Sequence, residues 1–393
     1  MISSTSFTSK AVFILIGALL LLPACASTGK PAPGYTGEGE RLRVAVLPFE
    51  NLSGGPVPLK TIRQSLIERL TAAGITILED GLLDRFMEKH RMRYTGGMDT
   101  RTSGPFRDEI QVDAVLITSV ELYNESIYPK IALISRLVST GKIPKIMWMD
   151  IVGKAGDDSP GILELGLVES MEILEIRALD ELTASLTRYL SARDGDMPAE
   201  IPAAEYVPAP FASYTDIPQM EQPTKFDPKF YYRSPLPTER KYIVAVVPFL
   251  NYSERRKAGD VLTLYFVRQL AKVSSVEVLE PGLVRQILLN RRVIMYGGVS
   301  LSDLDLISDY PEVDLVLSGK VLDYEDYSGV WGSPRVDFSV ELLDRTAREI
   351  VWSSKSFNEG DDAVLLFDWG KLNTASFMTS VMVANTVDKM PFR

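Results

Sequence analysis

The stretch VAVLPFENLS at residues 44–53 returns as VAVVPFLNYS at residues 244–253, with seven of ten positions identical at an offset of 200. The similarity continues far along the chain. It joins LEDGL (78–82) to LEPGL (279–283), VDAVLITSVELY (112–123) to VDLVLSGKVLDY (313–324), and GDD (156–158) to GDD (360–362). The chain therefore contains one domain twice, and two units of about 150 residues are each large enough to fold alone.

Each copy alternates strand and helix patterns. VAVLPF is a short, apolar run that ends at a proline, which is typical of a buried strand. Apolar residues then recur at helical spacing: Leu59, Ile62, Leu66 and Leu70. The whole pattern predicts the order β-α-β-α-β-β-β-α in each copy. The expected fold class is α/β, with two tandem homologous domains, each a mixed β-sheet covered by helices.

The composition along the chain predicts the domain boundaries. They are a lipoprotein signal peptide at 1–24, a lipidated flexible tether at 25–40, a first domain at 41–193, a Pro-rich linker at 194–239 and a second domain at 240–393. The linker has nine prolines in 46 residues, which favours an extended spacer. Seven aromatics among them favour packing along a domain or docking of a partner: Tyr206, Phe211, Tyr214, Phe226, Phe230, Tyr231 and Tyr232.

The amino terminus has the features of an export signal. Lys10 precedes an apolar run from Ala11 to Leu22, which is too short to span a membrane but fits a signal-peptide core. Leu22-Pro23-Ala24-Cys25 resembles the bacterial lipobox, in which the cysteine receives lipid. A secretory signal with a stray cysteine is the alternative. Cys25 is the chain's only cysteine, which excludes an intramolecular disulfide and a cysteine-based metal cluster.

The expected partners follow from anchoring and charge. Acyl chains on Cys25 would hold the protein at a membrane, since one chain alone binds only marginally. The lipobox resemblance, with no aspartate after the cysteine, implies the periplasmic face of the outer membrane. A net charge of −10, from 52 acidic and 42 basic residues, argues against nucleic acid as a partner.

The repeated motifs resemble a known family. The opening V-A-V-x-P-F-x-N-x-S, the amphipathic helix after it and the later V-D-x-V-L-x-x-x-V strand are similar to the periplasmic α/β domain shared by the curli secretion channel family and the TolB amino-terminal domain. The resemblance covers both halves of the chain. It implies adaptor, assembly or secretion work at the outer membrane rather than catalysis.

Candidate chemical groups are few. Asp157, Asp158, Asp361 and Asp362 are weak ligand candidates, because carboxylates bind hard cations or act as acid and base. Each pair precedes the last predicted helix of its copy, so we expect the aspartates to cap that helix. His90 is the single histidine, and we expect a partly buried structural or surface role. We predict no catalytic residue, metal site or cofactor.

Two further repeated pairs have structural explanations. Asn51 and Ser53 recur as Asn251 and Ser253, and their side chains favour a turn that ends the first strand. The double glycines at 96–97 and 297–298 follow a predicted helix, so we expect a helix stop and a turn there.

Three functional hypotheses follow. The first is a non-catalytic, lipid-anchored periplasmic adaptor or assembly factor that binds envelope or secretion-complex proteins. The second is a subunit of an outer-membrane secretion channel, which would need additional strand hairpins that the pattern does not show. The third is a hydrolase that uses repeated carboxylates such as Asp157 and Asp361.

Overall fold

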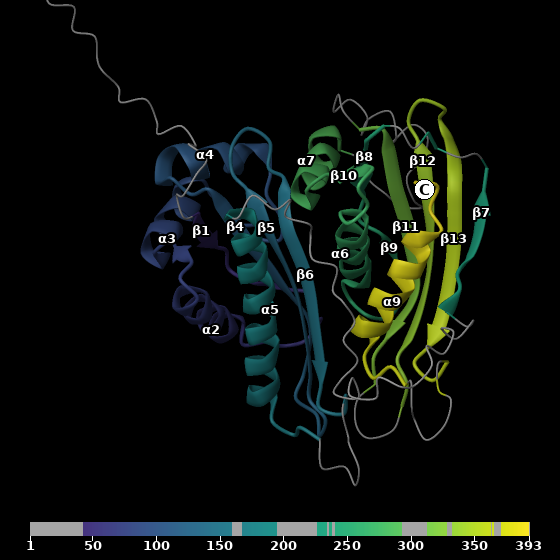
Figure 1. The fold of residues 1–393 in the computed structure, drawn as a ribbon, viewed down its shortest axis with the longest axis horizontal. Coiled ribbons are helices and arrows are strands. Elements are labelled where there is room, and N and C mark those ends of the chain that lie inside the picture. The colour runs from purple at the N-terminus through teal and green to yellow at the C-terminus, as the bar shows by residue number, and fades with distance from the viewer. Residues whose placement is uncertain are drawn as a thin grey trace, which may run out of the picture. The chain divides into compact units, whose positions relative to one another are not determined.

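The two copies of the repeated segment each build a mixed β-sheet in the computed structural model (Figure 1). The structure describes residues 42–158, 167–194, 226–233, 236–237, 240–292, 313–327, 332–362, 364 and 371–392. The signal peptide, Cys25, the tether, most of the linker and Gly297-Gly298 lie outside the described residues.

The first sheet has the strand order β3-β1-β4-β5-β6, with β2 paired to β4. Its strands are β1 (Arg43–Val46), β2 (Glu50–Asn51), β3 (Thr76–Ile77), β4 (Ala114–Asn124), β5 (Lys130–Ser139) and β6 (Ile146–Ala155). Strand β1 is parallel to β3 and β4, whereas β5 is antiparallel to both β4 and β6. Strand β6 is an edge of this sheet.

Helices lie on both faces of the first sheet. They are α2 (Leu59–Ala72), α3 (Asp80–Lys89), α4 (Thr100–Ile110) and α5 (Met171–Asp194). Helices α2 and α5 cover one face, where Ile62, Leu66 and Leu70 join one core cluster with Leu174 and Leu182. Helices α3 and α4 cover part of the other face through a second cluster. The expected element order omitted β2 and α4.

The second sheet repeats this plan. Its order is β10-β8-β11-β12-β13-β7, with β9 paired to β11. The strands are β7 (Lys229–Tyr232), β8 (Tyr242–Val246), β9 (Leu250–Asn251), β10 (Val276–Val278), β11 (Leu315–Glu325), β12 (Arg335–Asp344) and β13 (Glu349–Glu359), and the helices are α6 (Ala258–Leu270), α7 (Pro281–Arg291) and α9 (Ala375–Asp388). The predicted fold class, two tandem α/β domains, is therefore confirmed.

Strand β7 comes from the Pro-rich segment. It pairs antiparallel with β13, so part of this segment packs along the second domain, as one of the two alternatives predicted. Phe226, just before β7, is buried in the core of the second copy. Tyr206, Phe211 and Tyr214 lie outside the described residues.

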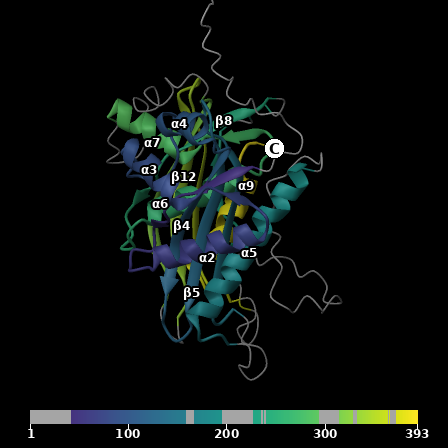
Figure 2. The same ribbon diagram turned by 90° about the vertical axis from the view of Figure 1, so that its left-hand side faces the viewer.

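Helices α6 and α9 lie between the two sheets (Figure 1), whereas α2 and α5 lie on the outer side of the first sheet (Figure 2). One core cluster joins their side chains to Leu52, Ile134 and Met149 of the first copy. Nearly every residue of α6 is buried, and α9 carries no charged residue before Asp388. A helix that is apolar on all sides is one that is covered on all sides. Residues Arg41–Arg393 accordingly form one compact unit.

Among the described residues, no helix combines the length and the apolar character needed to cross a membrane. The domain boundaries drawn from composition stay predictions.

Candidate functional site

The contact between the two copies contains a fully buried ion pair. Arg136 on β5 lies 3.0 Å from Glu280 at the start of α7, and neither side chain is exposed to solvent. The backbone N–H groups of Met98 and Gly282 also donate to the Glu280 carboxylate. Arg136 donates a further bond of 2.6 Å to the Gly96 carbonyl. A buried charge is tolerated when it is paired and hydrogen-bonded, as both charges are here.

A second polar centre surrounds Glu121 of β4. Its carboxylate accepts hydrogen bonds from the hydroxyls of Tyr265 at 2.6 Å and Tyr324 at 2.5 Å, both in the second copy. Arg255 stacks over the Tyr324 ring at 4.3 Å and donates to the Glu121 carbonyl oxygen. Burial and the neighbouring Glu121 charge raise the pKa of Tyr265 and of Tyr324 well above the usual value. Both hydroxyls therefore stay protonated and act as donors.

Two more polar centres join the copies at the strand ends and the β6 edge. Asp150 of β6 accepts from Ser185 of α5 at 2.6 Å and from Arg268 of α6 at 2.7 Å, so it bridges helices on opposite sides of the sheet. Burial and the nearby Arg268 charge lower the pKa of Lys272 to about 8. The Asp150–Arg268 pair therefore holds β6 of the first copy against α6 of the second copy.

Asp157, a ligand candidate, belongs to the last of these centres. Lys130 is buried, donates to Asp326 at 2.8 Å and to the Asn373 carbonyl at 2.8 Å, and lies 3.4 Å from the centre of the Tyr327 ring. Tyr327 in turn donates to Asp157 at 2.8 Å. Asp157 therefore has a role in the contact between the copies.

Two of the other aspartate candidates, Asp158 and Asp362, support turns. Asp158 accepts from the Ala155 N–H at 2.7 Å, and Asp362 accepts from the Glu359 N–H at 3.1 Å. The prediction that these aspartates cap a helix is wrong. The N–H groups that they accept from belong to the last residues of β6 and β13, whereas α5 begins only at Met171 and α9 at Ala375. Asp361 is exposed. The described part of the chain brings together no group of three or more His, Cys, Asp or Glu side chains able to hold a metal ion.

The repeated Asn and Ser residues form the predicted turn. Asn51 Oδ1 accepts from the Ser53 N–H at 2.9 Å, and Asn251 Oδ1 accepts from the Ser253 N–H at 3.1 Å. The two copies therefore end their first strand with the same side-chain-supported turn, and the prediction is confirmed.

His90 is the C-cap residue of α3, and its Nε2 lies 3.1 Å from Glu109 Oε2. Its ring centre is 4.4 Å from that of Phe86. The predicted structural role of a partly buried histidine is confirmed by these contacts.

The expected helix stop at Gly96-Gly97 is wrong, because α3 ends at Lys89. Gly97 instead permits a close approach between the copies. A Cβ on Gly97 would lie 2.8 Å from Gly282 Cα, and one on Gly282 would lie 2.6 Å from the Met98 carbonyl carbon. Such distances leave no room for a side chain, so both glycines are required by backbone-to-backbone packing.

One face of the first sheet receives α6 and α9. Leu52 and Glu121 on this face are each 1% exposed because the second copy covers them. Gly153 of β6 lies so close to α9 that a Cβ there would be 3.1 Å from Ser376 Oγ. The equivalent positions of the second copy, by the repeat offsets of 200, 201 and 204, are Tyr252, Leu322 and Phe357.

Outside the area covered by α7, the same face of the second sheet is open and carries large apolar side chains. We call Tyr231, Tyr252, Leu322 and Phe357 the open-face patch; they are 59%, 57%, 40% and 52% exposed. The strand register places them on one side of the sheet. Phe357 pairs with Asp337, and Asp337 pairs with Asp323, which follows Leu322 at an irregularity of β11. Tyr231 pairs with Ser353, which lies four residues before Phe357 and so faces the same side of β13. Several large apolar groups exposed on one side of a sheet favour an interaction surface there.

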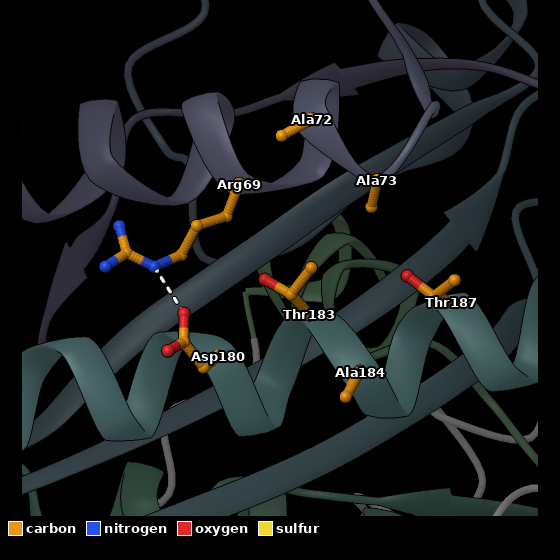
Figure 3. A pocket seen from close by; sticks show the side chains of 7 residues that line it. All are labelled: Arg69, Ala72, Ala73, Asp180, Thr183, Ala184 and Thr187. Atoms are coloured by element: carbon orange, nitrogen blue, oxygen red, sulfur yellow. Dashed lines mark hydrogen bonds and ion pairs between the residues drawn. The ribbon is translucent and has the colours of Figure 1, made fainter.

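A groove runs along the outer side of the first copy between α2 and α5 (Figure 3). Arg69 of α2 and Asp180 of α5 form an ion pair of 2.8 Å across it. The Thr183 and Thr187 hydroxyls are buried and have no hydrogen-bond partner among the described residues. Small side chains form the rest of the lining: Ala72, Ala73 and Ala184. The groove therefore has space for a larger side chain from outside.

No family model matches the sequence, and no curated protein matches it. Among solved structures, PelC from Paraburkholderia phytofirmans, described as a dodecamer, is 20% identical with a TM-score of 0.30, covering 42% of this chain and 95% of that one. Lipoprotein GNA1162 from Neisseria meningitidis is 17% identical with a TM-score of 0.27, covering 36% and 96%. The LpoB C-terminal domain from Salmonella enterica is 14% identical with a TM-score of 0.23, covering 30% and 83%.

Similarities at this level establish neither a shared function nor a shared partner. The resemblance to the curli secretion channel and TolB domains stays a prediction.

Proposed function

We propose that this chain is a non-catalytic, lipid-anchored adaptor or assembly factor of the bacterial cell envelope, which binds other proteins at the periplasmic face of the outer membrane. The observation that carries the binding role is the open-face patch. Four large apolar side chains stay exposed on the face whose counterpart in the first copy is buried by a protein contact.

The contact between the copies supports this role. Buried ion pairs need precise partners, so the Arg136–Glu280 and Asp150–Arg268 pairs favour one arrangement of the two copies. The second sheet is thereby presented on a rigid base rather than on a loop. Rigid presentation lowers the entropy lost when a partner binds.

Anchoring is tested at Cys25. In cells fed a labelled fatty acid, we expect the full chain to carry the label and the Cys25→Ser variant to carry none, because the thiol is the acceptor in the lipobox hypothesis. Ser27→Ala, two residues away, should keep the label. Equal labelling of the wild type and Cys25→Ser would refute lipid anchoring at this residue.

Binding through the patch is tested by crosslinking. A photo-reactive amino acid at Phe357 should join the membrane-anchored protein to specific envelope proteins in cells, among which a second copy of this chain counts, since this ring is about half exposed on the patch. The same group at Ile127, which is exposed in the β4–β5 connection of the first copy, serves as the matched control. Identical products at both positions, or none at Phe357, would contradict a binding role for the patch.

A further inference from the structure

We infer that the partner of the open-face patch is the α2–α5 face of a second copy of this chain, in a head-to-tail arrangement. This inference rests on the proposed function, because it names an occupant for the same patch. It follows from the contact between the first sheet and the helices α6 and α9. That contact leaves two surfaces uncovered, one face of the second sheet and the outer side of α2 and α5.

The contact within the chain joins two different surfaces. The first copy contributes a sheet face, whereas the second copy contributes the helix pair α6 and α9. A contact between unlike surfaces leaves one of each kind unmatched. Here the unmatched surfaces are the open face of the second sheet and the helix pair α2 and α5 of the first copy.

At the two unmatched surfaces, the sizes of the side chains are reversed relative to the equivalent positions in the contact within the chain. There, the sheet has a glycine at Gly153, and the turn after α6 carries Lys272 and Val273. At the open surfaces, the sheet carries Phe357 at the position of Gly153. The end of α2 carries Ala72 and Ala73 at the positions of Lys272 and Val273.

The register of the existing contact places the groove against the patch. Lys272 follows Arg268 of the second copy by four residues, and Arg268 donates to Asp150 at the edge of the first sheet at 2.7 Å. The equivalents of Lys272 and Asp150 are Ala72 in the groove and Ser354 on β13. Ser354 pairs with Phe230 of β7, the neighbour of Tyr231 in the patch. Repeating the contact between two chains therefore brings Tyr231 to the groove lined by Ala72 and Ala184.

The oligomeric state of the full, detergent-extracted chain tests this inference. By sedimentation equilibrium we expect self-association that weakens at least tenfold in Tyr231→Glu and, separately, in Ala184→Trp. Both residues are exposed, so the fold should persist, and circular dichroism checks that it does. Ile127→Glu should associate like the wild type. The double variant Tyr231→Cys with Ala184→Cys should form disulfide-linked chains, whereas neither single cysteine variant should.

Several outcomes would overturn the inference. A monomer at every concentration would do so, as would association that Tyr231→Glu abolishes and Ala184→Trp leaves intact, because that result indicates patch-to-patch pairing. In either case, crosslinking of Phe357 to other envelope proteins would still support the proposed function. The two ideas therefore fail separately.

Discussion

Replacing Glu280 by alanine is expected to lower the free energy of unfolding by about 3 to 5 kcal/mol, the usual cost of leaving a buried charge without its partner. Arg136 is fully buried 3.0 Å from this carboxylate, and no solvent reaches it to replace the lost charge. The N–H groups of Met98 and Gly282 would lose their acceptor as well. Urea denaturation followed by circular dichroism measures the effect.

The duplication supplies the control for this substitution. Glu79 occupies the equivalent position of the first copy, precedes α3, and makes no side-chain bond to the helix start. Glu79→Ala should therefore change stability by less than about 0.5 kcal/mol. The double variant Arg136→Met with Glu280→Met should be more stable than Glu280→Ala, because it removes both charges. A Glu280→Ala variant as stable as Glu79→Ala would show that the pair contributes nothing.

Gly282→Ala should destabilise the protein by about 3 kcal/mol, at the upper end of the range for overpacking a filled interior. The new Cβ would lie 2.6 Å from the Met98 carbonyl carbon, and backbone cannot rotate away as a side chain can. The α7 start or the Met98 segment must move, which also disturbs the Arg136–Glu280 pair. Thermal and urea unfolding of the purified chain measure the loss.

Gly81→Ala is the matched control, at the equivalent place in α3. Its added Cβ would meet nothing closer than 3.6 Å, from a flexible Glu79 side chain. Alanine is also the better helix former by about 0.5–1 kcal/mol, so this variant should be as stable as the wild type or slightly more so. If both glycine substitutions behaved alike, the close approach of the two copies at Gly282 would not exist in solution.

The sequence could not predict α4. The segment contains Gly104 and Pro105, which usually end a helix, yet Pro105 is accommodated inside it. The local signal in its favour is Asp99, whose side chain accepts from the Arg101 and Thr102 N–H groups as a helix cap. Packing of Phe106 against Phe86 then holds the helix on the sheet, and such a contact is not visible in a local pattern.

One sequence signal for the packing of the copies was available. The α2 segment carries charged residues along one side, whereas its equivalent α6 is apolar almost throughout, and α9 lacks charges until its end. That difference between equivalent helices indicates that the second pair has no face in water.

The sequence by itself determined the duplication, the alternation of strands and helices, and the Asn-Ser turns, because each depends on residues close together in the chain. Only the tertiary structure decided that Glu121 is buried against Tyr265 while its equivalent Leu322 faces solvent. The same holds for Arg136 and its partner Glu280 in the other copy. Periodicity shows that a side of a strand is covered, but the covering residues come from distant segments that meet only when the chain folds.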